Sequence, residues 1–223
     1  MPESRTMVVT AEDGHSFSAY VAAPGGRPRA GLVVVQEIFG VNHHIRAIAD
    51  GYAAEGFRVV APGLFDRVRP GIELGYDADG VAQGRALRNE IGWDAPMLDI
   101  DAALKLAGLD GRSGVIGYCW GGSLAWLAAA RLKPAAAVCY YGGQIAQFRD
   151  EAPTCPVLMH FGESDQLIPP ADREAIAAAQ PSVEMHVYDA GHGFACTERA
   201  DFHADSARLA KERTLAFLDR HLA

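Results

Sequence analysis

Five short runs of the chain are apolar throughout or nearly so, and they constrain its fold more than any other feature. They cover residues 32–35, 59–61, 115–116, 135–141 and 157–161, the last with a histidine inside it. Strands that are covered on both faces, as in a parallel sheet, give continuous apolar runs instead of alternating ones. The sequence therefore predicts a buried, mostly parallel sheet.

Helical patterns separate these runs. Residues 99–107 place Ile100, Leu104 and Ala107 on one face, residues 124–132 are rich in Ala and Leu, and residues 201–222 form the longest amphipathic pattern. Repeated strand, helix and strand units imply right-handed crossovers. We expect an α/β fold with a doubly wound sheet of about seven or eight strands, flanked by helices.

The two ends of the sheet and one long segment have other patterns. Asp13-Gly14 lies between two short β-rich runs and indicates an antiparallel hairpin at one edge. Residues 183–188 alternate between apolar and polar, as expected of a half-exposed strand near the other edge. Residues 66–94 are polar and contain glycine. We interpret them as a partly helical excursion that covers the functional site of the protein.

Length, charge and composition exclude several classes of protein. The 223 residues contain no repeat or linker, so we expect residues 1–223 to form one domain. A formal net charge of -8 argues against nucleic-acid binding, which depends on clustered Lys and Arg. No apolar stretch approaches the ~20 residues of a membrane span, and the N-terminal residues do not resemble a signal peptide. We expect a cytoplasmic monomer or small homo-oligomer that contacts no membrane.

The four cysteines are scattered along the chain. None belongs to a CxxC pair or has a histidine at zinc-ligand spacing, and we expect no metal, no cofactor and only free thiols. They are Cys119, Cys139, Cys155 and Cys196.

One of these cysteines lies at a sharp corner, in the sequence GYCWGG of residues 117–122. A strand that ends at Tyr118 and a helix that begins near Trp120 force Cys119 into a tight turn above the carboxyl ends of the strands. Glycines on both sides remove the Cβ atoms that would obstruct close packing of strand and helix. The pattern GxCxG is the cysteine form of the nucleophile elbow. A helix N-terminus also favours negative charge, so this thiol is poised to react, whereas the other three cysteines fit small core residues.

A nucleophile of this kind needs a base, and the base needs an acid that orients it. His192 lies in YDAGHGF, directly after the strand predicted at residues 183–188, and Asp165 lies in HFGESDQLIP, directly after another. Alone, such residues are more often a surface histidine and a turn-forming aspartate. Together with Cys119 they follow the chain order of α/β hydrolases, and we predict a Cys119, His192 and Asp165 triad at one edge of the sheet.

The stretch QEIFG at residues 36–40 follows the first buried run. Glu37 ends that strand and is expected to face the same crevice, although a charged residue at a strand end is usually only solvated. The backbone N–H groups of Ile38 and Trp120 are predicted to form the oxyanion hole.

These motifs together resemble the dienelactone hydrolase family, the carboxymethylenebutenolidases of the α/β hydrolase superfamily. The pairing of GxCxGG with QEIFG is specific, and the similar order of elements covers nearly the whole chain. The resemblance implies a carboxylic ester hydrolase with Cys119 as nucleophile, His192 as base and Asp165 as its orienter. It implies that Glu37 holds or activates the thiol, and that a lactone ring opens as an acyl-thioester which water then releases.

The resemblance also implies residues around the substrate. Phe39 and Tyr140 would line the pocket, and arginines would grip a substrate carboxylate. One family arginine comes four residues after the catalytic histidine, where this chain has Cys196, with Arg199 as the nearest later arginine. The other comes from the segment before the helix at residues 99–107, where the candidates are Arg85 and Arg88. Gly193 replaces a serine found in studied members.

Two alternative functions remain open at this point. The chain could be a binding or sensing protein that keeps the fold without turnover, since fold does not imply function. It could also use Cys119 in redox chemistry, although no resolving cysteine is adjacent in sequence. His43 and His44 open a helical pattern near QEIFG and could rim the pocket, but we expect both to be exposed to solvent.

Overall fold

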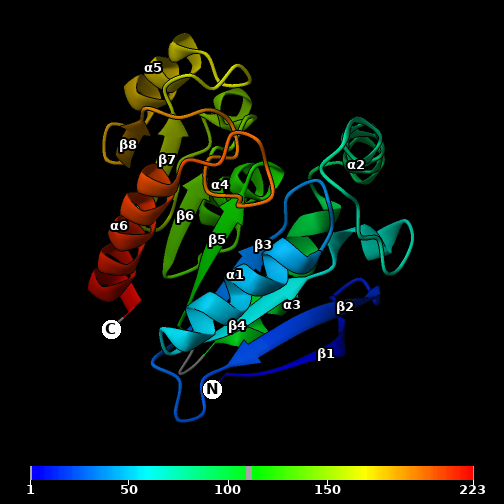
Figure 1. The fold of residues 1–223 in the computed structure, drawn as a ribbon. Helices are drawn as coiled ribbons and strands as arrows, with labels where there is room; N and C mark the ends of the chain where they lie inside the picture. Colours follow the sequence, from blue (N-terminus) through cyan, green and yellow to red (C-terminus); the bar gives the residue numbers. More distant parts are fainter. Residues whose placement is uncertain (1, 109–111, 223) are drawn as a thin grey trace.

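The computed structural model describes residues 2–108 and 112–222. Their strands form one sheet in the order β1-β2-β4-β3-β5-β6-β7-β8 (Figure 1). The strands are β1 (Glu3–Thr10), β2 (Ser16–Ala23), β3 (Ala30–Val35), β4 (Phe57–Pro62), β5 (Ser113–Tyr118), β6 (Ala136–Tyr140), β7 (Val157–Gly162) and β8 (Glu184–Tyr188).

The sheet has the predicted pairing. Every neighbouring pair from β4 through β8 is parallel, while β1 pairs antiparallel with β2, and β2 with β4. The hairpin at Asp13-Gly14 and the edge strand β8 are both confirmed. The five apolar runs lie in β3, β4, β5, β6 and β7. Every position of these strands is buried except Arg58 of β4, because helices cover both faces of this part of the sheet.

Helices flank the sheet on two faces, as expected of a doubly wound fold. In Figure 1, α1 and α6 lie on the face toward the viewer, and Lys211 of α6 lies over the ring of Tyr52 in α1. On the far side α3 packs beside α4. The α-helices are α1 (His43–Ala54), α2 (Ala78–Ile91), α3 (Ala95–Ala107), α4 (Trp120–Arg131), α5 (Pro170–Ala179) and α6 (Ala204–Leu222). No helix within the described ranges has the length and apolarity of a membrane span.

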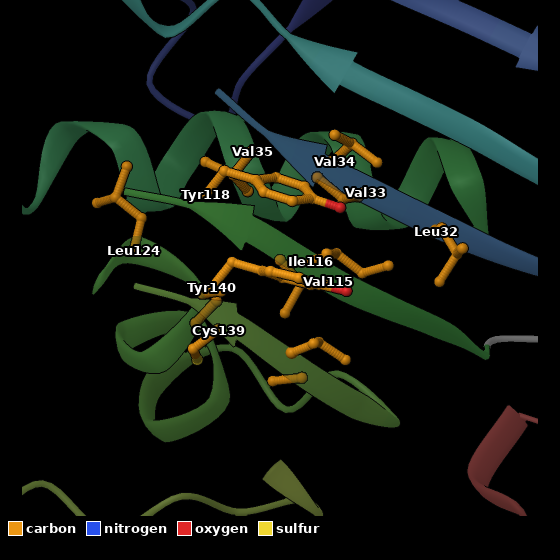
Figure 2. Packing of buried hydrophobic residues seen from close by; sticks show 14 of the residues in the cluster. Leu32, Val33, Val34, Val35, Val115, Ile116, Tyr118, Leu124, Cys139 and Tyr140 are labelled. Carbon is orange, nitrogen blue, oxygen red and sulfur yellow. The ribbon is translucent and has the colours of Figure 1, made fainter. Parts of the chain in front are cut away.

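The core contains a buried polar network between the sheet and α6. The rings of Tyr118 and Tyr140 are stacked with centroids 4.6 Å apart, among the residues drawn in Figure 2. The Tyr140 hydroxyl lies 2.7 Å from Thr214 Oγ1, which also lies 3.0 Å from Nε2 of His160. His160 Nδ1 lies 2.8 Å from the Tyr188 hydroxyl. Both ring nitrogens of the histidine inside the last apolar run therefore have partners, which lets it be fully buried.

The excursion predicted at residues 66–94 begins inside the short 3-10 helix η1 (Leu64–Arg67) and contains the whole of α2. Arg67 anchors η1, because its guanidinium makes two 2.8 Å hydrogen bonds to Asp99 of α3 and a third of 2.8 Å to Asp13 in the hairpin turn. Further along the excursion, the middle of α2 packs against QEIFG so closely that a Cβ added to Gly84 would lie 2.0 Å from the carbonyl oxygen of Ile38. The excursion thus fixes one wall of the site.

Replacing Arg67 with Met tests this anchor. The Asp99 side chain is 0% exposed, and burial raises the pKa of its carboxyl group despite the opposing effect of Arg67. Arg67→Met would leave that group without a partner, so we expect the free energy of unfolding in urea to fall by about 3–5 kcal/mol. Arg208→Met is the matched control, since Arg208 pairs with Glu212 on an exposed face and should cost less than ~1 kcal/mol. Equal losses in the two variants would contradict the anchoring role.

Candidate active site

Cys119 lies at the corner that the sequence predicts, between β5 and α4. Its backbone has φ 55° and ψ −115°, a region that residues other than glycine rarely occupy. Such a conformation costs of order 1–3 kcal/mol and persists only where the surroundings enforce it. One enforcing contact is the 3.0 Å hydrogen bond from the Cys119 amide to the carbonyl oxygen of Tyr140. The corner therefore presents the thiol at the carboxyl end of the sheet.

Gly117 explains why strand and helix can pack so closely at this corner. A Cβ atom added there would lie 1.7 Å from the carbonyl oxygen of Gly121, which is backbone and cannot move aside cheaply. The first turn of α4 also packs against the end of β3, since a Cβ at Gly121 would lie 2.4 Å from the Val35 carbonyl oxygen. The glycines thus allow α4 to start directly beneath the thiol.

The structure brings the three distant members of the predicted triad together. His192 Nε2 lies 3.2 Å from Cys119 Sγ, and His192 Nδ1 donates a 2.8 Å hydrogen bond to Asp165 Oδ2. The Leu167 amide donates a further 2.8 Å hydrogen bond to the other oxygen of Asp165. With His192 7% and Asp165 3% exposed, the imidazole is held between thiol and carboxylate in one orientation.

The electrostatics of this trio favour a charged imidazole. Burial by itself lowers the pKa of His192, but the negative charge of an ionised Cys119 and the hydrogen bonds to Asp165 and Cys119 outweigh it and raise the pKa to about 10. A proton that leaves the thiol therefore has a strong acceptor 3.2 Å away. The arrangement can hold a thiolate and imidazolium pair in a largely dry site.

Glu37 lies beside the triad and is fully buried. The Tyr76 hydroxyl donates a 3.2 Å hydrogen bond to Glu37 Oε2, and Arg199 Nη1 lies 3.6 Å from Oε1. Burial raises the pKa of Glu37, while the charges of Arg199 and His192 act in the opposite direction. In the described part of the chain Glu37 makes no hydrogen bond with Cys119. The Glu37 carboxylate is thus held by Tyr76 and Arg199.

Arg199 is a site residue that sequence reasoning did not assign. Its guanidinium lies near Glu37 and 6.0 Å from the ring centroid of Phe39. Gly193 makes room for it: this residue has φ +79°, and a Cβ there would lie 2.7 Å from Cδ and Nε of Arg199. The departures noted at positions 193, 196 and 199 are therefore connected. Because Gly193 has no side chain, the guanidinium of Arg199 can occupy the space beside it. The glycine is therefore the sequence feature that could have indicated a role for Arg199.

The structure places Tyr140 elsewhere than the sequence analysis expected. Tyr140 is buried in the core with its hydroxyl on Thr214, as described above. The next residue, Tyr141, has φ 38° and turns its ring to within 5.3 Å of the His192 ring, centroid to centroid. Strand β6 ends at Tyr140, and the positive φ of Tyr141 turns the next side chain toward His192. Tyr141 takes the place predicted for Tyr140.

The remaining candidates divide between the site and the surface. Phe39 is buried, with its ring centroid 4.4 Å from that of Tyr76. Arg85 is exposed on α2, and Arg88 donates a 3.0 Å hydrogen bond to Asn89 of the same helix, so the described contacts join neither to the triad. His43 is exposed as expected, but the expectation for His44 is wrong. His44 is only 5% exposed, because α1 packs its first turn against QEIFG and the excursion.

The two predicted oxyanion donors lie at neighbouring strand ends. Val35 of β3 pairs with Gly117 of β5 in a parallel register, so the segments that follow them emerge at one edge of the sheet. Trp120 is the first residue of α4, and its amide has no partner within the helix. Ile38 follows the end of β3 three residues after Val35.

The chain is similar to known proteins over nearly its whole length. The model of the dienelactone hydrolase family matches residues 17–222. The chain belongs to the dienelactone hydrolase family. It is 36% identical to the carboxymethylenebutenolidase of Pseudomonas putida, with 92% of each chain covered, and 33% identical to that of Pseudomonas sp. strain P51, with 95% and 93% covered.

A solved structure shows the same fold. The crystal structure of a "Putative Dienelactone Hydrolase" from Klebsiella pneumoniae aligns with a TM-score of 0.87 at 28% identity, covering 98% of this chain and 99% of that one. The expected α/β hydrolase architecture is therefore confirmed for this dienelactone hydrolase family member.

The pKa of His192 can be measured in a variant that removes the neighbouring charge. Cys119→Ala removes the sulfur that contacts the imidazole, so we expect the pKa of His192 to fall from about 10 toward the ordinary histidine value. Asp165→Asn should lower it as well. The histidine Cε1–H signal, followed by NMR against pH, reports both shifts. An unchanged pKa in Cys119→Ala would show that thiol and imidazole do not interact.

Proposed function

We propose that this chain hydrolyses lactones or small carboxylic esters through a Cys119 acyl-enzyme. The observation that carries the proposal is the continuous line of contacts from Cys119 Sγ to His192 Nε2, 3.2 Å, and from His192 Nδ1 to Asp165, 2.8 Å. Membership of the dienelactone hydrolase family and the carboxymethylenebutenolidase relatives support the same reaction.

In the first half-reaction Cys119 loses its proton to His192 and the thiolate attacks the carbonyl carbon. Negative charge develops on the carbonyl oxygen, where the amides of Ile38 and Trp120 would donate hydrogen bonds. The carbon–oxygen bond of the ester or lactone then breaks, and His192 returns its proton to the leaving oxygen. Asp165 keeps Nδ1 protonated throughout, so that Nε2 is the nitrogen that exchanges the proton.

In the second half-reaction water releases the acyl group. His192 removes a proton from the water, whose oxygen attacks the thioester carbonyl. The carbon–sulfur bond then breaks, and the thiolate recovers the proton from His192. The products are a carboxylic acid and, for a lactone, the hydroxyl or enol group of the opened ring.

We assign Glu37 the role of holding or activating the thiol. Its carboxylate is buried beside the triad, where negative charge is costly unless a cation compensates for it. Arg199 supplies that compensation in the free protein, with 3.6 Å between Nη1 and Oε1. A substrate carboxylate that drew Arg199 away would leave the negative charge of Glu37 acting on His192 alone, and this charge stabilises the imidazolium that forms when Cys119 gives its proton to His192. Substrate binding would thus promote deprotonation of Cys119.

Arg199 also suggests the class of substrate. It takes the part that the family gives to the arginine four residues after the histidine, where this chain has Cys196. A guanidinium at the edge of the site favours an acid-bearing lactone over a neutral one. The name carboxymethylenebutenolidase, carried by the Pseudomonas relatives, is consistent with such a substrate.

The proposal also covers the domain organisation, oligomeric state, partners and cellular compartment of the enzyme. Residues 1–223 would act as one domain, as a monomer or small homo-oligomer, on a small molecule and without nucleic acid, membrane or cofactor. The net charge of -8 supports the absence of nucleic acid. A catalytic thiol must stay reduced, which favours the cytoplasm.

Cys119→Ala tests the nucleophile. We expect kcat/KM for p-nitrophenyl acetate to fall by at least ~10³-fold, because no other group can form the acyl-enzyme. Cys155→Ala is the matched control, since that half-buried thiol has no glycine frame and should be replaceable. Wild-type turnover in Cys119→Ala would refute the mechanism. Ligand binding by the wild-type protein without turnover of any ester would favour a binding protein.

Arg199→Met tests the substrate class. Hydrogen bonds to charged groups contribute about 1.5–3 kcal/mol, so kcat/KM for trans- or cis-dienelactone should fall by about 10- to 100-fold more than that for a neutral aryl ester. Gly193→Ser should give a similar but smaller change, because its Cβ would displace the Arg199 side chain. Equal losses for charged and neutral substrates would exclude a carboxylate-binding role for Arg199.

A further inference from the structure

Three buried side chains that could ligate a metal ion meet next to the triad. Glu37 follows β3, His44 lies in the first turn of α1, and Cys196 lies in the loop after His192. Their ligand atoms, a carboxylate oxygen, a ring nitrogen and a sulfur, all lie within 4.8 Å of one another. The residues are 0%, 5% and 0% exposed. We call these residues the Glu37 cluster.

Two polar atoms of the Glu37 cluster lack hydrogen-bond partners. Within residues 2–108 and 112–222, Glu37 Oε1 and His44 Nε2 are both buried and make no hydrogen bond, although Arg199 lies 3.6 Å from the former. Most buried polar atoms in native proteins are satisfied, and an exception calls for an explanation such as a bound ion. Two such atoms in one group of possible ligands point to the same explanation.

The donor set selects the kind of ion. Thiolate and imidazole suit Zn²⁺ and Co²⁺, whereas Mg²⁺ and Ca²⁺ prefer oxygen ligands alone. Ligand atoms around a tetrahedral zinc ion lie roughly 3.5 Å apart. Side-chain rotations that move the ligand atoms of the Glu37 cluster about 1 Å closer together would therefore let all three contact one ion. Water would take the fourth position, as it does in other zinc sites with three protein ligands.

We propose that Glu37, His44 and Cys196 form a binding site for a divalent ion of the zinc class. When the sulfur–metal bond forms, Cys196 releases its thiol proton to solvent, and no electron is transferred. The ion competes with the Arg199 guanidinium for the same carboxylate. Occupancy therefore removes Glu37 from the thiol and inhibits the enzyme, and this consequence rests on the function proposed for Glu37, whereas the binding does not.

Cobalt binding to the Cys119→Ala protein tests the site without any turnover. Removing Cys119 matters because the pair of Cys119 and His192 is itself able to ligate a metal ion. We expect one equivalent of Co²⁺ to produce a thiolate-to-cobalt charge-transfer absorption, which Cys119→Ala/Cys196→Ser loses and the control Cys119→Ala/Cys155→Ser keeps. Absence of the band in Cys119→Ala, or its persistence without Cys196, would overturn the site.

Two further variants distinguish loss of a metal ligand from misfolding of the Cys196→Ser variant. His44→Gln, made in the same background, should weaken Co²⁺ binding by more than ~10-fold, since even outer-shell partners of metal ligands commonly contribute that much. Arg199→Met should strengthen binding, because it removes a positive charge from beside the ion. A loss of fold would not tighten binding, so unchanged or weaker binding in Arg199→Met would count against the site.

Inhibition of the active enzyme tests the consequence separately. We expect Zn²⁺ to inhibit ester hydrolysis by the wild-type protein, and Cys196→Ser to raise the concentration needed for half inhibition by more than ~10-fold. Inhibition that is unchanged in Cys196→Ser would assign the effect to the pair of Cys119 and His192, and would overturn the regulatory part. Failure of the hydrolase proposal would instead appear as an inactive wild-type protein that still binds Co²⁺.

Discussion

The strained backbone at Cys119 is the constraint on which the rest of the site depends. A residue with φ 55° between a strand and a helix is stable only where its neighbours leave no alternative. Buried β3, β5 and β6 and the close approach of α4 supply that enforcement. The conformational energy is offset by packing across the whole sheet, so the position of the thiol reflects the entire fold.

Around that thiol the chain balances several buried charges. His192 lies between an acid on one side and a sulfur on the other, while Glu37 has Arg199 as its nearest cation. Every one of these groups is mostly or fully removed from water, where an uncompensated charge is costly. A change of partner at any one of them therefore shifts the others, and such coupling allows a bound substrate or ion to alter the reactivity of Cys119.

The loop from His192 to Arg199 shows how this chain differs from the family pattern. A glycine follows the histidine, a cysteine stands where the family resemblance leads us to expect an arginine, and an arginine lies three residues later. The structure connects these departures, because the guanidinium from position 199 lies over the bare α-carbon of Gly193. Cys196 is thereby left beside Glu37 and His44.

The sequence by itself determined the parallel sheet, its antiparallel edge and the corner at Cys119, because each follows from local patterns of apolarity, glycine and strand ends. It also predicted that Cys119, His192 and Asp165 meet at one edge of the sheet, and the structure places the three side chains in contact. The sequence did not determine which of two adjacent tyrosines faces the imidazole, nor that His44 is buried. It gave no sign that Cys196 meets a carboxylate and an imidazole, since ligands from three distant segments have no common spacing. Only the packing of α1, the excursion and the loop after His192 against one another decided those contacts, because side-chain proximity across a core depends on tertiary structure.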